Sequence, residues 1–134
     1  MSEPQTATPP PVPPPDDKPA RAWNMLCHLG ALAGLFVPFG NILGPLIFWQ
    51  IKKNDFPSVD VHGKAALNFQ ITVTLAAFAG AFAAILLSFF CIGYLLVPMV
   101  ILIGLAGLVF AVIAGVKANN GEDYKYPWSV QFVK

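Results

Sequence analysis

The chain has 134 residues, of which 56% are hydrophobic and only 11% are charged. A soluble domain carries roughly 25% charged residues, so this composition excludes an ordinary water-soluble globule and indicates an integral membrane protein in contact with the lipid bilayer. The formal net charge of +1 also excludes a strongly basic nucleic-acid binder.

A proline-rich arm opens the chain at residues 1–20. Eight of the 13 prolines lie in residues 1–19. Proline lacks a backbone donor and fixes φ, so we expect a disordered or polyproline II-like cytoplasmic arm. This arm is either a plain spacer or a docking site for a proline-recognising partner. The rest of the chain, residues 21–134, is expected to form a single membrane domain.

The first uncharged block covers residues 23–51. As one helix its 29 residues would reach about 43 Å, against a hydrocarbon core of about 30 Å. Pro38, Gly40, Gly44 and Pro45 interrupt it, and Gly40 permits a sharp turn. We therefore predict two short helices, at about 22–37 and 42–53, that dip into the membrane and return. One kinked span is the alternative.

The second uncharged block, residues 65–116, is long enough for two spans. We predict helices at about 61–89 and 95–119, joined by a turn at residues 91–94 in which Gly93 takes a positive φ. Pro98 fits the first turn of the last helix, and Gly121 fits its left-handed cap. The fold class is therefore all-α, an integral membrane helical bundle with two short helices and a long transmembrane hairpin.

Basic residues in short loops stay on the cytoplasmic side of a membrane. If the first block crosses once, six of the basic residues are inside and two outside; if it dips and returns, all eight are cytoplasmic. The second layout fits the rule better and puts both termini in the cytoplasm. Tryptophans at positions 23, 49 and 128 fit interfacial anchors, and the tail after Gly121 is expected to lie on the membrane or to pair as a short strand.

Polar side chains at membrane depth are costly and are the first place to look for function. We consider a polar, partly hydrated vestibule at the cytoplasmic end, against the simpler interpretation of hydrogen bonds between helices. The candidate residues are Asn24, His28, Asn41, His62, Lys64, Asn68 and Gln70. His28 and His62 follow no metal- or haem-binding spacing, so no metal and no other cofactor is expected.

No catalytic motif is visible, so we expect no enzyme and no catalytic residue. The carboxylates stand in loops beside lysines, and Asp60 is placed to cap the third helix. Small residues at four-residue spacing allow close helix contact, within the chain or between copies. The helix-packing candidates are Gly30, Gly34, Gly80, Gly107 and Gly115, whereas the Gly40–Gly44 pair is interpreted as turn geometry.

Several segments resemble a family of small bacterial membrane proteins. They are WNMLCHL at 23–29, PFGNILGPLI at 38–47, HGKAALNFQ at 62–70, and KANNGE at 117–122 followed by YKYP at 124–127. The resemblance is to the domain-of-unknown-function family 4870, which is sometimes described as similar to the small Tic import subunit of the chloroplast inner envelope. It implies a four-helix protein of the bacterial inner membrane, with both ends cytoplasmic and no established activity.

These observations lead to two expectations about function. The first is a small non-catalytic inner-membrane protein that works by binding, as a scaffold or as a component associated with translocation or assembly, with a protein partner or a second copy of itself. The alternative is a subunit of an oligomeric channel or transporter, because discontinuous helices often mark substrate sites in transporters.

Overall fold

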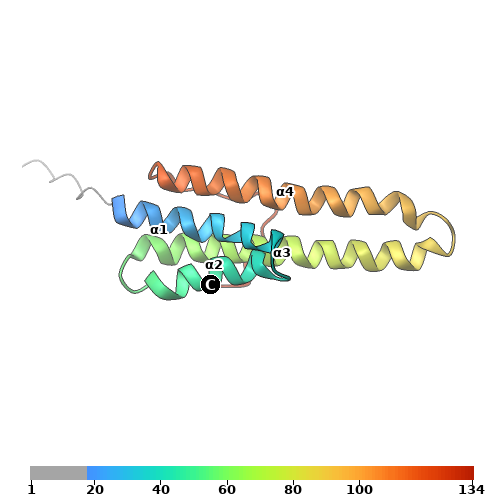
Figure 1. Cartoon of the computed structure of the whole chain (residues 1–134), viewed down its shortest axis with the longest axis horizontal. Helices are drawn as coiled ribbons and strands as arrows, with labels where there is room; N and C mark the ends of the chain where they lie inside the picture. Colours follow the sequence, from blue (N-terminus) through green and yellow to red (C-terminus); the bar gives the residue numbers. More distant parts are fainter. Residues whose placement is uncertain (1–17) are drawn as a thin grey trace, which may run out of the picture.

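The computed structural model describes residues 18–134 and shows an elongated helical bundle (Figure 1). In chain order the elements are α1 (Lys18–Leu29), the 3-10 helix η1 (Gly30–Leu35), α2 (Gly40–Lys52), α3 (Pro57–Ser88) and α4 (Gly93–Asn119). None of the residues from 18 onward forms a strand. The predicted all-α fold with two short helices and a long hairpin is confirmed.

Helices α3 and α4 are the long arms of this fold. They have 32 and 27 residues, they run antiparallel, and both are long and apolar enough to cross a membrane. Both begin earlier than the predicted positions 61 and 95. Pro98 consequently lies in the interior of α4 and not in its first turn, and without an N–H it cannot donate a hydrogen bond to the carbonyl one turn before it. The predicted arm is described only from Lys18, where α1 already begins.

The sharp turns are made differently from the prediction. The residues with left-handed backbone are Phe39 and Cys91, each with φ of 59°, and not Gly40 and Gly93. The two glycines are required for close approach instead, because a Cβ on Gly40 would overlap the carbonyl group of Ala33, and one on Gly93 would overlap a carbonyl of α3. The left-handed cap predicted for Gly121 is confirmed, with φ of 79°.

The two short helices form a hairpin, which we call the short hairpin (residues 18–52). Its first arm was predicted as one helix at 22–37, but α1 ends at Leu29 and the chain continues as η1. Gly44 lies inside α2 and faces Gly30, where a Cβ would overlap the Gly30 carbonyl oxygen. The interpretation of Gly40–Gly44 as turn geometry alone was therefore wrong: Gly44 is where the two arms cross with their backbones in contact.

The short hairpin covers only part of α3. Near the start of α3, Trp49 of α2 donates a hydrogen bond from Nε1 to Asp60 at 2.9 Å. At the other end, the ring of Phe39 stacks on that of Phe78, with centroids 6.0 Å apart. Beyond Phe78 the second half of α3 and the first half of α4 continue alone (Figure 1), and we call this part, residues 79–103, the distal hairpin.

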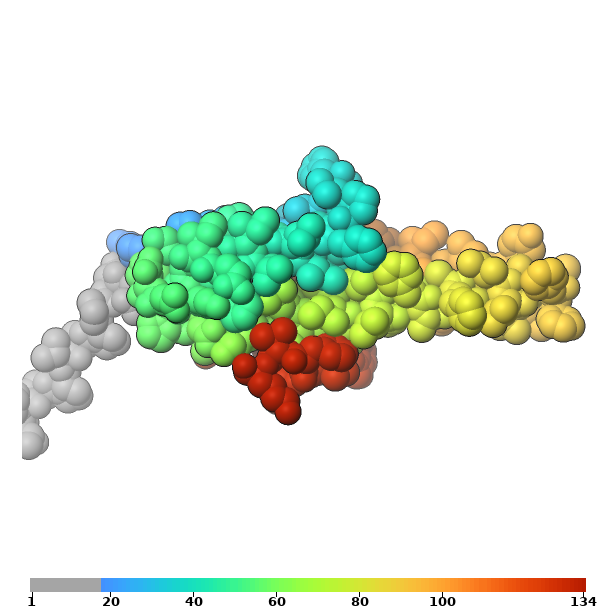
Figure 2. Space-filling model, turned by 90° about the horizontal axis from the view of Figure 1, so that it is seen from below, coloured from blue at the N-terminus to red at the C-terminus, as the bar shows by residue number. Residues whose placement is uncertain are grey.

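The tail after α4 folds back along α3 (Figure 2, red). The ring of Tyr126 is buried and stacks on Phe69, with centroids 4.0 Å apart. Asn68 holds the end of the tail: its Nδ2 donates to the carbonyl of Val133 at 2.9 Å, and its Oδ1 accepts from the amides of Phe132 and Val133 at 2.9 and 2.6 Å. These bonds from a side chain replace the strand pairing that we considered for this segment.

Candidate functional site

The seven residues predicted to line a vestibule do not all contact one another in the structure. They are divided among separate contacts between elements: Asn24 with Ser58, His28 with His62, Asn41 with Gln70, Lys64 with Asp60, and Asn68 with the tail. Every buried side-chain nitrogen or oxygen atom among residues 18–134 has a hydrogen-bond partner. Most of these contacts join different helices.

Four side chains form a continuous chain of hydrogen bonds that begins at the buried Tyr126 and ends at the exposed Asp123, both in the tail after α4. Tyr126 Oη lies 2.7 Å from His28 Nδ1, and His28 Nε2 lies 2.9 Å from His62 Nδ1. His62 Nε2 in turn lies 3.1 Å from the exposed carboxylate of Asp123. The sequence offered no signal for Tyr126, since it is 98 residues from His28 and belongs to no helix.

The direction of each hydrogen bond in this series can be assigned by starting from the exposed carboxylate of Asp123. A carboxylate only accepts, so His62 donates from Nε2 and, as a neutral ring, accepts at Nδ1. His28 must then donate from Nε2 and accept the hydroxyl proton of Tyr126 at Nδ1. Burial, with the nearby His62, lowers the pKa of His28 to about 3, and burial raises the pKa of Tyr126 above its usual value. His28 and Tyr126 are therefore neutral at physiological pH.

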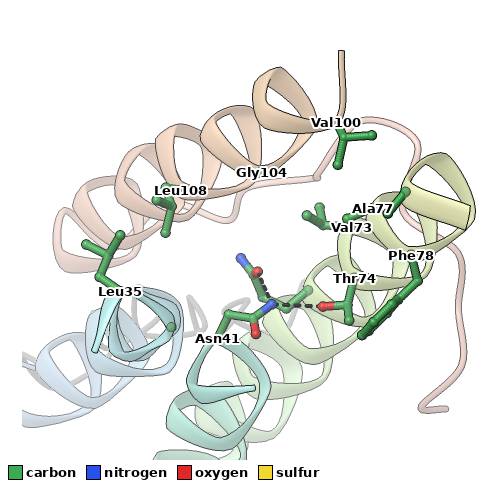
Figure 3. Close-up of a pocket in the computed structure, with 12 residues that line it drawn as sticks. Leu35, Asn41, Val73, Thr74, Ala77, Phe78, Val100, Gly104 and Leu108 are labelled. Atoms are coloured by element: carbon green, nitrogen blue, oxygen red, sulfur yellow. Dashed lines mark hydrogen bonds between the residues drawn. The ribbon is translucent and has the colours of Figure 1, made fainter. Parts of the chain in front are cut away.

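A second polar group lies beside a cavity of about 440 Å³ (Figure 3). Asn41 donates from Nδ2 to Gln70 Oε1 at 3.2 Å and to Thr74 Oγ1 at 2.9 Å, which ties α2 to α3. Apolar side chains, among them Val73 and Leu108, form the remaining walls. This group gives the cavity one polar edge inside an otherwise apolar region.

The sequence suggested that Asp60 caps α3, but in the structure it does not. The cap position is occupied by Phe56, which provides no side-chain hydrogen bond. Asp60 lies one turn further on and accepts hydrogen bonds from Trp49 Nε1 at 2.9 Å and from Lys64 Nζ at 2.6 Å. Its carboxylate therefore links α2 to α3, because Trp49 belongs to α2 and Asp60 to α3.

Tryptophan and lysine side chains meet at the same end of the bundle. Lys52 Nζ lies 5.4 Å from the centre of the Trp23 ring, and Lys53 Nζ lies 4.7 Å from that of Trp49. The charged residues from 18 onward all belong to residues 18–21, 52–64, 117–125 and 134, which gather at this end, and we call it the charged end. The distal hairpin carries no charge.

The five candidate packing glycines all face other parts of the same chain. A Cβ would come within 3.0 Å of a neighbouring atom at each: Gly44 for Gly30, Asn41 for Gly34, Val100 for Gly80, Val73 for Gly107 and Leu29 for Gly115. These contacts join η1 to α2, α3 to α4, and α4 to α1. The glycines therefore allow the elements of a single chain to approach closely.

The polar side chains and the glycines described above make contacts between elements of the same chain. No group of three histidine, cysteine, aspartate or glutamate side chains among residues 18–134 is placed to hold a metal ion. Large apolar side chains such as Phe82 and Leu102, 65% and 64% exposed, cover the outside of the distal hairpin. These features define the class: a small helical membrane protein with polar contacts inside and apolar side chains outside.

The family follows from comparison with known sequences. A family model described as MamF/MmsF, the magnetosome magnetite crystal formation protein family, matches residues 19–133, and the chain belongs to this family. The resemblance to family 4870 and to the Tic subunit was therefore wrong, because the family that matches is a different one. Some of the residues that suggested this resemblance, such as Gly40 and Gly44, are required for close contact between helices. No curated protein and no solved structure matches the chain.

Proposed function

We propose that this protein is a non-catalytic assembly component of a membrane in which magnetite crystals form, and that it acts by binding other proteins or further copies of itself. The family description supports the setting. The observation that carries the mode of action is the contrast between inside and outside. The buried polar side chains are bonded to one another, as in Tyr126–His28–His62, whereas the distal hairpin carries no charge and presents mainly large apolar side chains.

We further propose an orientation for the bundle. Lys52, Lys53, Lys64 and Lys117 gather at the charged end, and basic residues in short loops are retained in the cytoplasm. The charged end therefore faces the cytoplasm, with both termini, and the turn between α3 and α4 faces the opposite side. In this layout the protein belongs to the bacterial inner membrane or to a compartment derived from it.

Photo-crosslinking in native membranes tests the binding role. A photoreactive residue replaces Phe82 or, separately, Leu102, since both side chains point away from the bundle. We expect discrete protein adducts from these positions, because an interface inside lipid needs close side-chain packing. The matched control carries the same residue at Asp55, in the exposed loop of the charged end, and measures background labelling. Adducts with lipid alone at both apolar positions would contradict the proposal.

A channel or transporter subunit remains the second candidate, and one feature favours it. The cavity edged by Asn41, Gln70 and Thr74 brings polar atoms to a region with apolar walls. It ranks second because the Asn41 amide group is already bonded to both neighbours. Ion flux into vesicles that contain the purified protein separates the two proposals, because a pore conducts ions and an assembly component, even one that binds copies of itself, does not.

A further inference from the structure

The depth at which the short hairpin stops can be read from α3. Asn41 at the start of α2 bonds Thr74, and Phe39 stacks on Phe78. Helix α3 continues for 14 residues beyond Thr74 and 10 beyond Phe78, up to Ser88. At 1.5 Å per residue, the tip of the short hairpin lies about 15–21 Å short of the far end of α3.

The same rise per residue gives the position of the hydrocarbon core along α3. A hydrocarbon core of about 30 Å takes about 20 residues, so a core that starts at Ser88 ends near Asn68. This boundary agrees with the side chains: Lys64, Asp60 and Trp49 lie outside it, and Asn68 holds the end of the tail at the boundary itself. The tip of the short hairpin then lies close to the middle of the bilayer.

The tip of the short hairpin consists of apolar side chains that no other part of the described chain covers. Leu35, Phe36, Val37 and Phe39 are all exposed, and Phe36 is 86% exposed. Figure 2 shows this segment, in cyan, projecting sideways from the body of the molecule at about mid-length. A cluster of large apolar side chains at this depth meets the acyl chains of the near leaflet, so lipid is the occupant that fits it.

We infer that the short hairpin acts as a wedge in the leaflet next to the charged end. The protein therefore prefers curved membranes in which this leaflet is the convex one. In the leaflet next to the charged end, η1, the start of α2 and part of the tail lie beside α3 and α4, whereas only α3 and α4 cross the other leaflet. Two extra helices of 10–12 Å diameter add about 160–230 Å² to one leaflet only. A body wider on one side fits best where that leaflet is the outer, expanded face of a small vesicle.

Purified full-length protein in vesicles of phosphatidylcholine and phosphatidylglycerol tests this inference. The exposed thiol of Cys91, in the turn between α3 and α4, is labelled with a fluorophore, while Cys27 is buried. An impermeant quencher added outside silences molecules whose turn faces outward, so the remaining signal reports only those with the charged end outside. We expect their density per membrane area to be about twofold higher on vesicles of about 50 nm than on those of about 200 nm. Equal density at both sizes would overturn the inference.

Two matched variants separate the wedge from a general effect of charge. Phe36 and Phe89 are 86% and 85% exposed and both lie in turns, so replacement of either leaves the internal packing unchanged. Phe36→Lys places a charge in the middle of the bilayer, where it is costly, and withdraws the tip toward the near surface. Phe89→Lys places the same charge at the far surface. We expect the first variant to lose the preference for small vesicles and the second to keep it.

If both variants sort by vesicle size as the unmodified protein does, the short hairpin is not a wedge. The vesicles contain no other protein, so this result is independent of the binding role proposed above. Loss of crosslinks with retained sorting would overturn only the proposed function, and the reverse result would overturn only the wedge.

Discussion

Replacement of Gly44 by alanine is expected to lower the free energy of unfolding by about 3 kcal/mol. The new Cβ would overlap the carbonyl oxygen of Gly30, so the arms of the short hairpin must separate. The obstructing atom is backbone, which cannot rotate away as the end of a flexible side chain does. Unfolding in detergent, followed by circular dichroism at increasing denaturant, measures the loss.

Gly104→Ala is the matched control for this substitution. Gly104 also lies inside a helix, but nothing is within 4 Å of the place where its Cβ would be. Removal of a glycine from a helix interior stabilises by about 0.5–1 kcal/mol, so this variant should be slightly more stable than the unmodified protein. Equal stability of the two variants would show that α1–η1 and α2 do not cross at Gly30 and Gly44.

A second large effect is expected from mild acid. The imidazole of His28 has an ordinary pKa of 6.5, and in the folded protein burial, with the nearby His62, lowers that pKa to about 3. Between these pH values the unfolded chain binds a proton that the folded chain does not. The stabilisation is therefore complete above pH 6.5 and is lost as the pH falls toward 3. From pH 7 to pH 5 the loss amounts to about 2 kcal/mol.

His28→Gln is the variant that assigns this loss. The titratable groups around His28 are His62, Cys27, Tyr124, Tyr126 and, beyond His62, Asp123. All of them remain in the variant, so the difference in pH dependence between the two proteins belongs to His28. We expect denaturation curves at pH 7 and pH 5 to lie closer together for the variant. If the unmodified protein is as stable at pH 5 as at pH 7, His28 is not buried as described.

Spacing along the chain was sufficient for the parts of the fold that depend on length and polarity. The uncharged block at residues 65–116 could only be two helices, and the interruption around Gly40 divided the first block correctly. Exact ends were harder, because Gly93 starts α4 through contact with α3 and not through its own backbone freedom. Such a contact depends on how the chain turns between the two helices, which the types of the neighbouring residues do not specify.

The partners of the buried polar side chains could not be predicted from spacing along the chain either. Spacing along one helix could identify His28 as a candidate, but not its partners, since Tyr126 and His62 come from other segments. Asp123 read as a solvated loop charge, and only the structure brings it to His62. Asn68 was proposed for a vestibule, yet it holds the tail, because its amide matches the free backbone groups of Phe132 and Val133.

The tip of the short hairpin is expected to reach only the middle of the membrane, and the accessibility of thiols at two turns measures this depth. One protein keeps the native Cys91, and the other carries Phe36→Cys with Cys91→Ser; Cys27 is buried in both. With an impermeant thiol reagent on either side of the membrane, Cys91 should react only from the side opposite the charged end. A cysteine at position 36 should react from neither side, but should react with a lipid-soluble reagent. Reaction of position 36 from the same side as Cys91 would show that the short hairpin crosses the membrane completely and does not stop halfway.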